Sequence, residues 1–203
     1  MTTTAQTISV DRTALLVIDV QESFRHRAYW TEAELPAYLD RQNHLIAEAE
    51  AMGMPVIRIL HRDGPNVEAN PFSDASGHVR PLAGLRDFNA AATFIKERHS
   101  ALVGTGLDVW LTRHGIQNLV ISGIRTEQCC ETTTRHASDL GWTVHYALDA
   151  TLTFDMVQPN GSTLSAEDIR QRTATVLNGR FCTIWSTNAL LTAVQAQAEM
   201  EPA

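Results

Sequence analysis

Short continuous runs of apolar residues alternate along the chain with longer stretches in which apolar residues recur every three or four positions. The continuous runs are typical of strands buried on both faces of a parallel sheet, and the periodic stretches are typical of amphipathic helices. Six segments have the strand pattern: 13–19, 55–61, 92–96, 118–123, 142–149 and 181–186. Five segments have the helix pattern: 35–53, 106–115, 126–141, 165–178 and 188–200.

This alternation predicts one α/β domain over residues 1–203, with a three-layer αβα architecture. In it, helices cover both faces of a six-stranded parallel sheet. Ser165, followed three residues later by Asp168, has the residue types of a helix N-terminus. Residues 62–91 are rich in Pro, Gly, Asn and Asp, so we expect a long irregular segment of a kind that is often functional.

Polar residues stand at the predicted strand ends, and ligands bind such sheets beyond the carboxyl ends of the strands. The strand-end residues are Asp19, His61, Lys96 and Asp149, and the fourth strand leads through Gly123 into the helix that carries Cys129. We therefore expect a carboxylate, an amine and a thiol to converge on one edge of the sheet.

Composition excludes several classes of partner. The net charge is −7 with no basic stripe, which argues against nucleic acid. No apolar run approaches the roughly 20 residues that span a membrane, and the N-terminus lacks the basic and apolar regions of a signal peptide. The three cysteines form no CxxC pair, which favours free thiols in a reducing, cytoplasmic compartment.

The adjacent cysteines are predicted to differ. If Thr126 is the N-cap, Cys129 lies in the first helical turn, where free N–H groups and partial positive charge favour a thiolate and can hold an oxyanion. Cys130 lies about 100° further round the helix, on a face with small residues. We therefore interpret Cys130 as a core thiol, and Cys182, in a strand, in the same way.

Spacing leaves more than one candidate for the base that would accept the proton of such a thiol. His136 lies seven residues after Cys129, about 10 Å along a helix, which is too far for a base. His61 can contact a substrate or a loop. Asp19 can act as the base with Lys96 beside it, but the two can also form a structural ion pair. No histidine and acid spacing indicates a metal, so no metal or cofactor is predicted.

Three separated motifs resemble the isochorismatase-like cysteine hydrolase superfamily, which includes nicotinamidases and N-carbamoylsarcosine amidohydrolases. "ALLVIDVQESF" (14–24) is similar to its first-strand motif, and "FIKERHS" opens a segment (94–123) that is similar to its lysine segment. "SGIRTEQCCETTTRHASDLGW" (122–142) resembles its G-[VI]-x-T-x-x-C motif. The resemblance covers roughly residues 13–150.

The resemblance implies a Rossmann-like isochorismatase-type fold and a catalytic triad of Asp19, Lys96 and Cys129. The motif places the nucleophile six residues after the glycine, which selects Cys129 over Cys130. It also implies a cis peptide between Ile124 and Arg125, and an oxyanion hole made by the backbone N–H groups of Arg125 and Cys129. The implied reaction is hydrolysis of a C–N bond in a small amide, carbamoyl or lactam-like substrate through a thioester.

Two departures from the family keep alternatives open. Residues 61–72 lack the D-x-H metal motif of nicotinamidase-like members, which argues against a metal and a pyridine-carboxamide substrate. Members that cleave the vinyl ether of isochorismate can work without the cysteine, so an ether hydrolase with Asp19 as the acid is one alternative. A non-catalytic binding or redox-sensing protein on the same fold is another.

The residues predicted to contact the small-molecule substrate are Gln21, Phe24, Trp30, His61, Arg125, Thr126 and Phe154. Each can instead be a packing residue. Arg125 stands where many relatives have a small residue, and its side chain either pairs with an anionic substrate group or makes a structural or subunit contact. Because relatives are commonly oligomers, the resemblance also implies a homo-oligomer, a dimer or tetramer.

Overall fold

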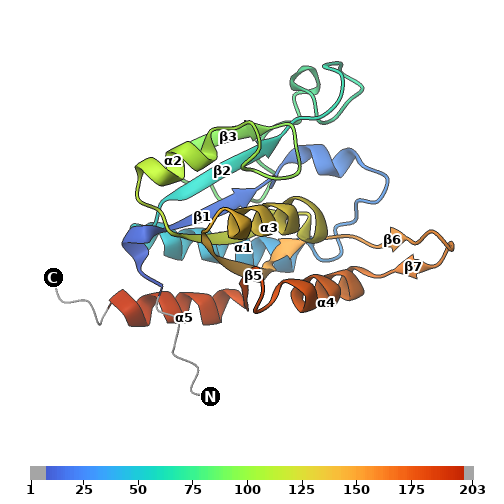
Figure 1. The fold of residues 1–203 in the computed structure, drawn as a ribbon. Helices are drawn as coiled ribbons and strands as arrows, with labels where there is room; N and C mark the ends of the chain where they lie inside the picture. The colour runs from blue at the N-terminus through green and yellow to red at the C-terminus, as the bar shows by residue number, and fades with distance from the viewer. Residues whose placement is uncertain (1–7, 199–203) are drawn as a thin grey trace.

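The central sheet of the computed structural model, which describes residues 8–198, consists of six parallel strands in the order β3-β2-β1-β4-β5-β8 (Figure 1). The strands are β1 (Thr13–Ile18), β2 (Val56–His61), β3 (Ala92–Lys96), β4 (Asn118–Ile124), β5 (Thr143–Leu152) and β8 (Thr183–Trp185). The predicted fold class is confirmed, with all six strands in their predicted places. β5 is longer and β8 shorter than the hydrophobic pattern indicated.

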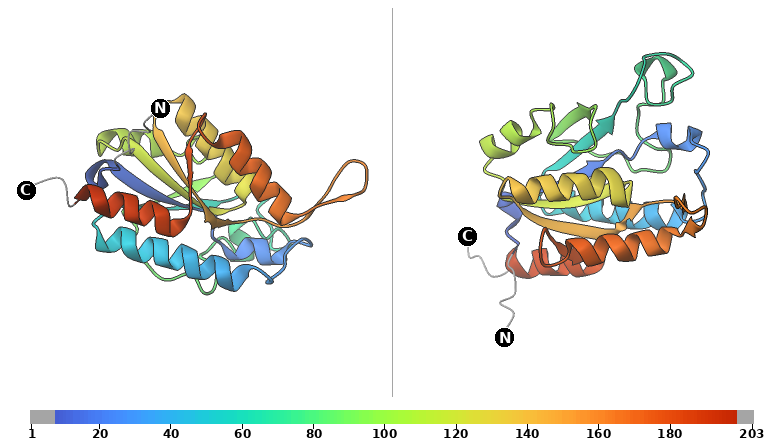
Figure 2. Two further views of the ribbon diagram at one scale, coloured as in Figure 1. Left: turned by 90° about the horizontal axis from the view of Figure 1, so that it is seen from below. Right: turned by 45° about the vertical axis from the view of Figure 1, so that its right-hand side comes forward.

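Helices cover both faces of the sheet (Figure 2). The helices are α1 (Leu35–Ala51), α2 (Leu107–Arg113), α3 (Glu131–Asp139), α4 (Ala166–Leu177) and α5 (Thr187–Ala198). α1 and α5 share one buried apolar cluster, and α2, α3 and α4 contribute to the other. The predicted last helix ran to residue 200, and its final two residues lie outside the described part of the chain.

The continuous apolar run of β1 is explained by these two layers. Leu15 and Val17 point into the cluster beneath α1, and Leu16 and Ile18 point into the cluster on the opposite face. Successive side chains of a strand alternate between faces, so a strand covered on both sides needs apolar residues at every position. Each such side chain contributes roughly 1.5–3 kcal/mol by burial.

Short elements fill the connections. They are the 3-10 turns Val10–Arg12, Glu22–His26 and Asp74–Ser76, the π-helical turn Thr126–Cys130, and a hairpin of β6 (Met156–Val157) and β7 (Thr163–Leu164). The segment 62–91 is otherwise irregular, as predicted. The hairpin projects from the body of the molecule (Figure 1) and was not predicted, because strands of two residues leave no periodic pattern.

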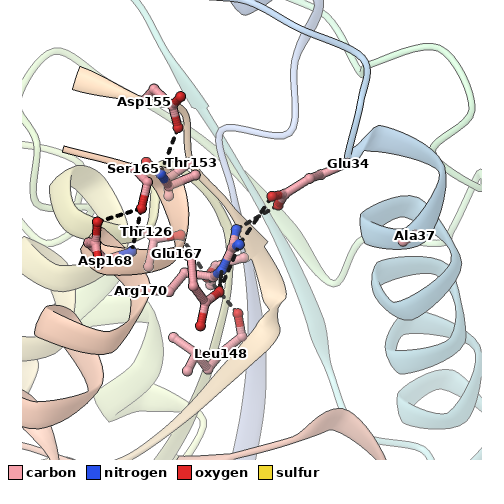
Figure 3. Close-up of polar contacts among 12 residues, drawn as sticks. Glu34, Ala37, Thr126, Leu148, Thr153, Asp155, Ser165, Glu167, Asp168 and Arg170 are labelled. Carbon is pink, nitrogen blue, oxygen red and sulfur yellow. Dashed lines mark hydrogen bonds and ion pairs between the residues drawn. The ribbon is translucent and has the colours of Figure 1, made fainter. Parts of the chain in front are cut away.

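The start of α4 follows the prediction from its sequence. Ser165 is the N-cap, and its Oγ accepts a hydrogen bond from the Asp168 backbone N–H at 3.1 Å (Figure 3). One turn further, Arg170 reaches from α4 to Glu34, with Nη1 2.6 Å from Oε2, and also pairs with Glu167. This ion pair ties α4 to the beginning of α1 across the end of β5.

The neighbouring strands β1 and β4 form the point at which the strand order reverses, and the backbones pack tightly there. Gly123 on β4 has φ +128°, and a Cβ at this position would lie 1.9 Å from the carbonyl oxygen of Ile18. Only glycine fits this position, because any side chain would push β4 away from the end of β1.

Gly123→Ala is therefore expected to destabilise the protein by about 3 kcal/mol or more, or to prevent folding. Gly141→Ala is the matched control, because Gly141 also has a positive φ, +98°, but its added Cβ would have no neighbour within 4 Å. Urea unfolding of the two variants separates the steric clash from the backbone conformation. Equal losses in both variants would contradict the clash.

A second prediction concerns His145, which is fully buried on β5 and accepts a hydrogen bond at Nδ1 from Trp185 Nε1 at 3.2 Å. Burial lowers the pKa of His145 to about 4. Because the unfolded chain binds the proton near pH 6.5, this residue should remove up to about 3 kcal/mol of stability as the pH falls from 6.5 to 4.

His145→Gln keeps an acceptor for Trp185 but does not titrate. The free energy of unfolding, measured for both proteins between pH 7 and pH 4, should fall more steeply in the wild type than in the variant. Parallel pH profiles would show that His145 does not carry this acid sensitivity.

Candidate functional site

Three of the residues predicted for the site lie at the carboxyl edge of the sheet and are brought together there. Asp19 directly follows β1, Lys96 ends β3, and Cys129 lies in the π-helical turn that follows β4. Their exposed fractions are 0%, 1% and 4%. β1 and β4 flank the reversal of strand order, which is where ligands bind in open α/β sheets.

Lys96 is the only lysine of the chain, and its ammonium group is the centre of this cluster. Its Nζ lies 2.7 Å from Asp19 Oδ2, 3.3 Å from Cys129 Sγ and 3.1 Å from His61 Nδ1. An ammonium group has three hydrogens, so these three acceptors use all of them. In this arrangement His61 Nδ1 accepts, and the His61 proton is on Nε2.

The electrostatics follow from this burial. Burial by itself lowers the pKa of Lys96, but the negative charge of Asp19 and the hydrogen bonds to Asp19 and Cys129 outweigh it, and the pKa is raised above its ordinary value. The pKa of His61 is lowered, by burial first and then by the Lys96 charge. At neutral pH, Lys96 is therefore charged and His61 is neutral.

Cys129 has a raised pKa, because burial and then the charge of Asp19 disfavour the thiolate more than Lys96 favours it. The helix N-terminus predicted at this position favours a thiolate, but burial is the larger effect. The resting group is a thiol beside a carboxylate. Neither oxygen of Asp19 has a hydrogen-bond partner apart from the ion pair with Lys96.

Asp19 is held in place by its backbone. It has a positive φ of +54°, a conformation that Asp tolerates better than most residues, and its N–H donates to the carbonyl of Ile59 at 2.9 Å. Gln21, which was predicted to contact substrate, binds the His61 backbone: its Oε1 accepts from the N–H at 2.7 Å, and its Nε2 donates to the C=O at 3.0 Å. Gln21 thus fixes the end of β2.

The helix after β4 starts differently from the prediction. Thr126 is not the N-cap, because its Oγ1 donates to Thr151 Oγ1 at 2.8 Å and its carbonyl accepts from Tyr146. The first turn is π-helical, with the Cys130 N–H bonded to the Arg125 carbonyl at 3.2 Å. Such turns often occur at functional sites. The peptide bond between Ile124 and Arg125 is cis.

Cys130 is fully buried in the apolar cluster beneath α2, α3 and α4, which also contains Ala137 of α3. Cys182 is also buried there. His136 packs against a loop, with its Nδ1 2.9 Å from Ser100 Oγ.

Asp149 does not reach the site, which corrects its predicted place. β5 bulges between Tyr146 and Thr151, and Asp149 instead binds the N-terminus of α5.

Arg125 makes contacts within its own chain. Its Nη2 lies 3.0 Å from Glu127 Oε1, and its guanidinium lies over the rings of Tyr29, at 4.6 Å, and Phe154, at 5.7 Å. Trp30 packs on the same Phe154, with ring centroids 5.2 Å apart. Sequence analysis missed Glu127 and Tyr29. The only signal for Glu127 was an acid two residues after an arginine in the same motif.

Six of the seven residues predicted to contact substrate separate into two groups, and the seventh, Thr126, bonds to Thr151 and Tyr146 instead. In the first group, His61 contacts Lys96 and Gln21 binds the His61 backbone. Phe24 makes an edge-on contact with Phe72, with 5.1 Å between ring centroids. Phe72 also contacts the ring of His61. Trp30, Arg125 and Phe154 form a second cluster.

Two cavities of the described structure are lined by residues other than Asp19, Lys96 and Cys129. One of about 240 Å³ lies beside Arg62, Phe72 and Arg98, just beyond β2 and β3. The other, of about 610 Å³, lies between α1, α4 and the end of β5.

Within residues 8–198, no group of three or more His, Cys, Asp or Glu side chains is arranged to hold a metal ion. None of the helices in this range has the length and apolar character that a membrane span requires.

Known proteins resemble this chain over most of its length. YrdC, an isochorismatase family protein of Bacillus subtilis strain 168, is 28% identical over 182 residues, 89% of this chain and 95% of YrdC. The streptothricin hydrolase of Streptomyces noursei is 30% identical over 70% of this chain and 50% of its own length. Nicotinamidase 3 of Arabidopsis thaliana is 28% identical over 70% of this chain and 74% of its own.

Solved structures agree with this. A Chromobacterium violaceum protein described as a hydrolase of the isochorismatase family superposes with a TM-score of 0.81 at 26% identity, covering 94% of this chain and 97% of its own. The N-carbamoylsarcosine amidase of Thermoplasma acidophilum shares the fold, with a TM-score of 0.67 at 20% identity, over 87% of this chain and 97% of its own. The model of the isochorismatase domain matches residues 13–180, and the chain therefore belongs to the isochorismatase family of hydrolases.

Proposed function

We propose that the protein hydrolyses a C–N bond of a small amide, carbamoyl or lactam-like substrate through a thioester on Cys129. The observation that carries the proposal is the contact of one buried ammonium group with both a carboxylate and a thiol, at 2.7 and 3.3 Å. The names of two relatives, a nicotinamidase and a streptothricin hydrolase, agree with amide hydrolysis.

In the first half of the reaction, Asp19 accepts the proton of the Cys129 thiol as Sγ attacks the substrate carbonyl carbon. The thiolate forms only during attack, which is consistent with the raised pKa of Cys129. The carbonyl oxygen becomes an oxyanion, and the backbone N–H groups of Arg125 and Cys129 bind it. The intermediate collapses, the C–N bond breaks, and the nitrogen leaves with the proton from Asp19.

In the second half, Asp19 accepts a proton from a water molecule, which attacks the thioester carbonyl. The C–S bond breaks, Sγ takes back the proton, and the carboxylic acid is released. Lys96 stays protonated throughout, because its pKa is raised. Its charge stabilises whichever of Asp19 or Cys129 is negative, while the third N–H of its ammonium group donates to Nδ1 of neutral His61.

The residues present do not fit the metal site of nicotinamidase-like proteins. His61, the first residue of the corresponding segment, directs Nδ1 to the Lys96 ammonium group, whose charge would repel a metal ion, and residues 61–72 lack the D-x-H spacing. We therefore assign no catalytic step to a metal. A homo-oligomer and a cytoplasmic location stay predictions from the sequence.

The two adjacent cysteines give the first test of this function. Cys129→Ser should lower turnover of a responsive amide by roughly a thousandfold or more, because the alcohol is a much poorer nucleophile in this site. Cys130→Ala should keep most of the activity and lose about 1 kcal/mol of stability. Turnover is measured on a panel of small amides and carbamoyl compounds, with mass spectrometry for an acyl adduct on Cys129.

Loss of activity in Cys130→Ala, with an active Cys129→Ser, would reverse the assignment. An active Cys129→Ala enzyme on isochorismate would instead support ether hydrolysis with Asp19 as the acid.

A further prediction concerns the buried charge of Lys96. Lys96→Met leaves the Asp19 carboxylate buried without a cation, so the variant should be inactive and lose about 3–5 kcal/mol of stability. Asp19→Asn combined with Lys96→Met removes both charges, and it should recover most of the stability but none of the activity. Urea unfolding compares the three proteins. A single variant as stable as the double variant would show that the ion pair is not buried in solution.

A further inference from the structure

Five residues form a second polar and aromatic cluster at the carboxyl edge of the sheet, which we call the aromatic subsite: Tyr29, Trp30, Arg125, Glu127 and Phe154. They come from three distant segments of the chain. Arg125 immediately precedes the turn that carries Cys129, and Phe154 lies two residues after β5. The subsite is therefore built on the same backbone that carries the proposed nucleophile.

The subsite has buried hydrogen-bond donors without acceptors. Arg125 Nε and Trp30 Nε1 are both shielded from solvent, and neither has a hydrogen-bond partner in the described structure. Arg125 as a whole is 4% exposed. Leaving a buried donor unpaired costs free energy, so these two donors, both close to the Phe154 ring, are available to an acceptor group of a ligand. A carbonyl oxygen can accept two hydrogen bonds.

The charges of the subsite are already balanced. Arg125 is paired with Glu127 at 3.0 Å, and the second oxygen of Glu127 accepts from Thr153 Oγ1 at 2.6 Å, which holds the carboxylate in place. Thr153 lies at the end of β5, beside the start of α4 (Figure 3). Burial raises the pKa of Tyr29, so its hydroxyl is neutral.

The nearest other cation is also paired. Arg25, whose guanidinium lies 5.9 Å from the Trp30 ring, pairs with Glu32 at 3.2 Å and with Glu22 at 3.8 Å. A carboxylate that entered the subsite would share the Arg125 guanidinium with Glu127, and two buried carboxylates repel each other. A neutral acceptor meets no such repulsion.

We propose that the aromatic subsite binds the part of the substrate that lies beyond the scissile carbonyl, and that it selects an uncharged group with a carbonyl-type oxygen over a carboxylate. The proposal rests on the proposed function, and it narrows the substrate to neutral amides with a second acceptor. Arg125 and Trp30 donate to that acceptor, and the rings of Tyr29 and Phe154 pack against the carbons. Glu127 sets the charge preference.

The test measures binding and does not depend on turnover. The Cys129→Ala protein is titrated with succinamide, succinamate and butyramide, which share a primary amide and differ in the distal group: a neutral carbonyl, a carboxylate and a methyl group. Tryptophan fluorescence, with Trp30 in the subsite, and calorimetry report the affinity. Succinamide should bind about tenfold tighter than either of the other two.

Glu127→Gln, introduced into the same protein, keeps an acceptor for Thr153 but frees the charge of Arg125. Succinamate should then gain about tenfold in affinity, while succinamide changes little. Arg125→Gln together with Glu127→Gln should lose that gain. Trp30→Phe keeps an aromatic ring but removes the N–H, so calorimetry should show weaker binding of succinamide and unchanged binding of butyramide. This variant retains both Arg125 and Glu127, so it tests the subsite even if the Glu127 variant does not fold.

Several results would overturn the subsite: no binding of any probe, succinamate binding as tightly as succinamide, or no change in their ratio on Glu127→Gln. Failure of the proposed function appears separately. In that case the protein with Cys129 intact would turn over none of the small amides tested and form no adduct on that residue, whatever the order of affinities.

Discussion

The buried ammonium group of Lys96 is the interaction on which the carboxyl edge of the sheet depends. An ammonium without solvent needs three acceptors, and it finds them at the ends of β1 and β2 and in the turn after β4. His61 and Lys96 are register partners on β2 and β3, so the sheet itself delivers the side chain to this point. The close approach of Gly123 to Ile18 then brings β4 to the same place.

Burial has a chemical consequence as well as a structural one. A thiol beside a carboxylate and away from water stays protonated, because the thiolate would be a second negative charge next to Asp19. The positive charge of Lys96 still stabilises a negative charge on either Asp19 or Cys129, so a proton can pass from the thiol to the carboxylate. The proposed nucleophile is therefore a thiol at rest, and Asp19 is the proposed acceptor of its proton.

The same logic of paired charges recurs a few residues away. Arg125 is neutralised by Glu127 in the way that Lys96 is neutralised by Asp19, and both pairs are buried. A site with two cations already paired to carboxylates, and with unpaired N–H donors on Arg125 and Trp30, fits an uncharged polar substrate better than an anion. The isochorismatase fold supplies the sheet edge, and in the proposed aromatic subsite Glu127 and Trp30 set the preference of this chain for an uncharged substrate group.

The sequence by itself determined the sheet, the helices and the order of the strand-end residues, because apolar periodicity and the parallel topology place Asp19, Lys96 and Cys129 on one edge. It did not determine the π-helical turn, the bulge that moves Asp149 to α5, or the pairing of Arg125 with Glu127. Those features depend on contacts between segments far apart in the chain, such as Thr126 with Thr151 and Arg125 with Tyr29. Local pattern cannot encode such contacts, since a side chain's partner is fixed only when the strands have taken their register.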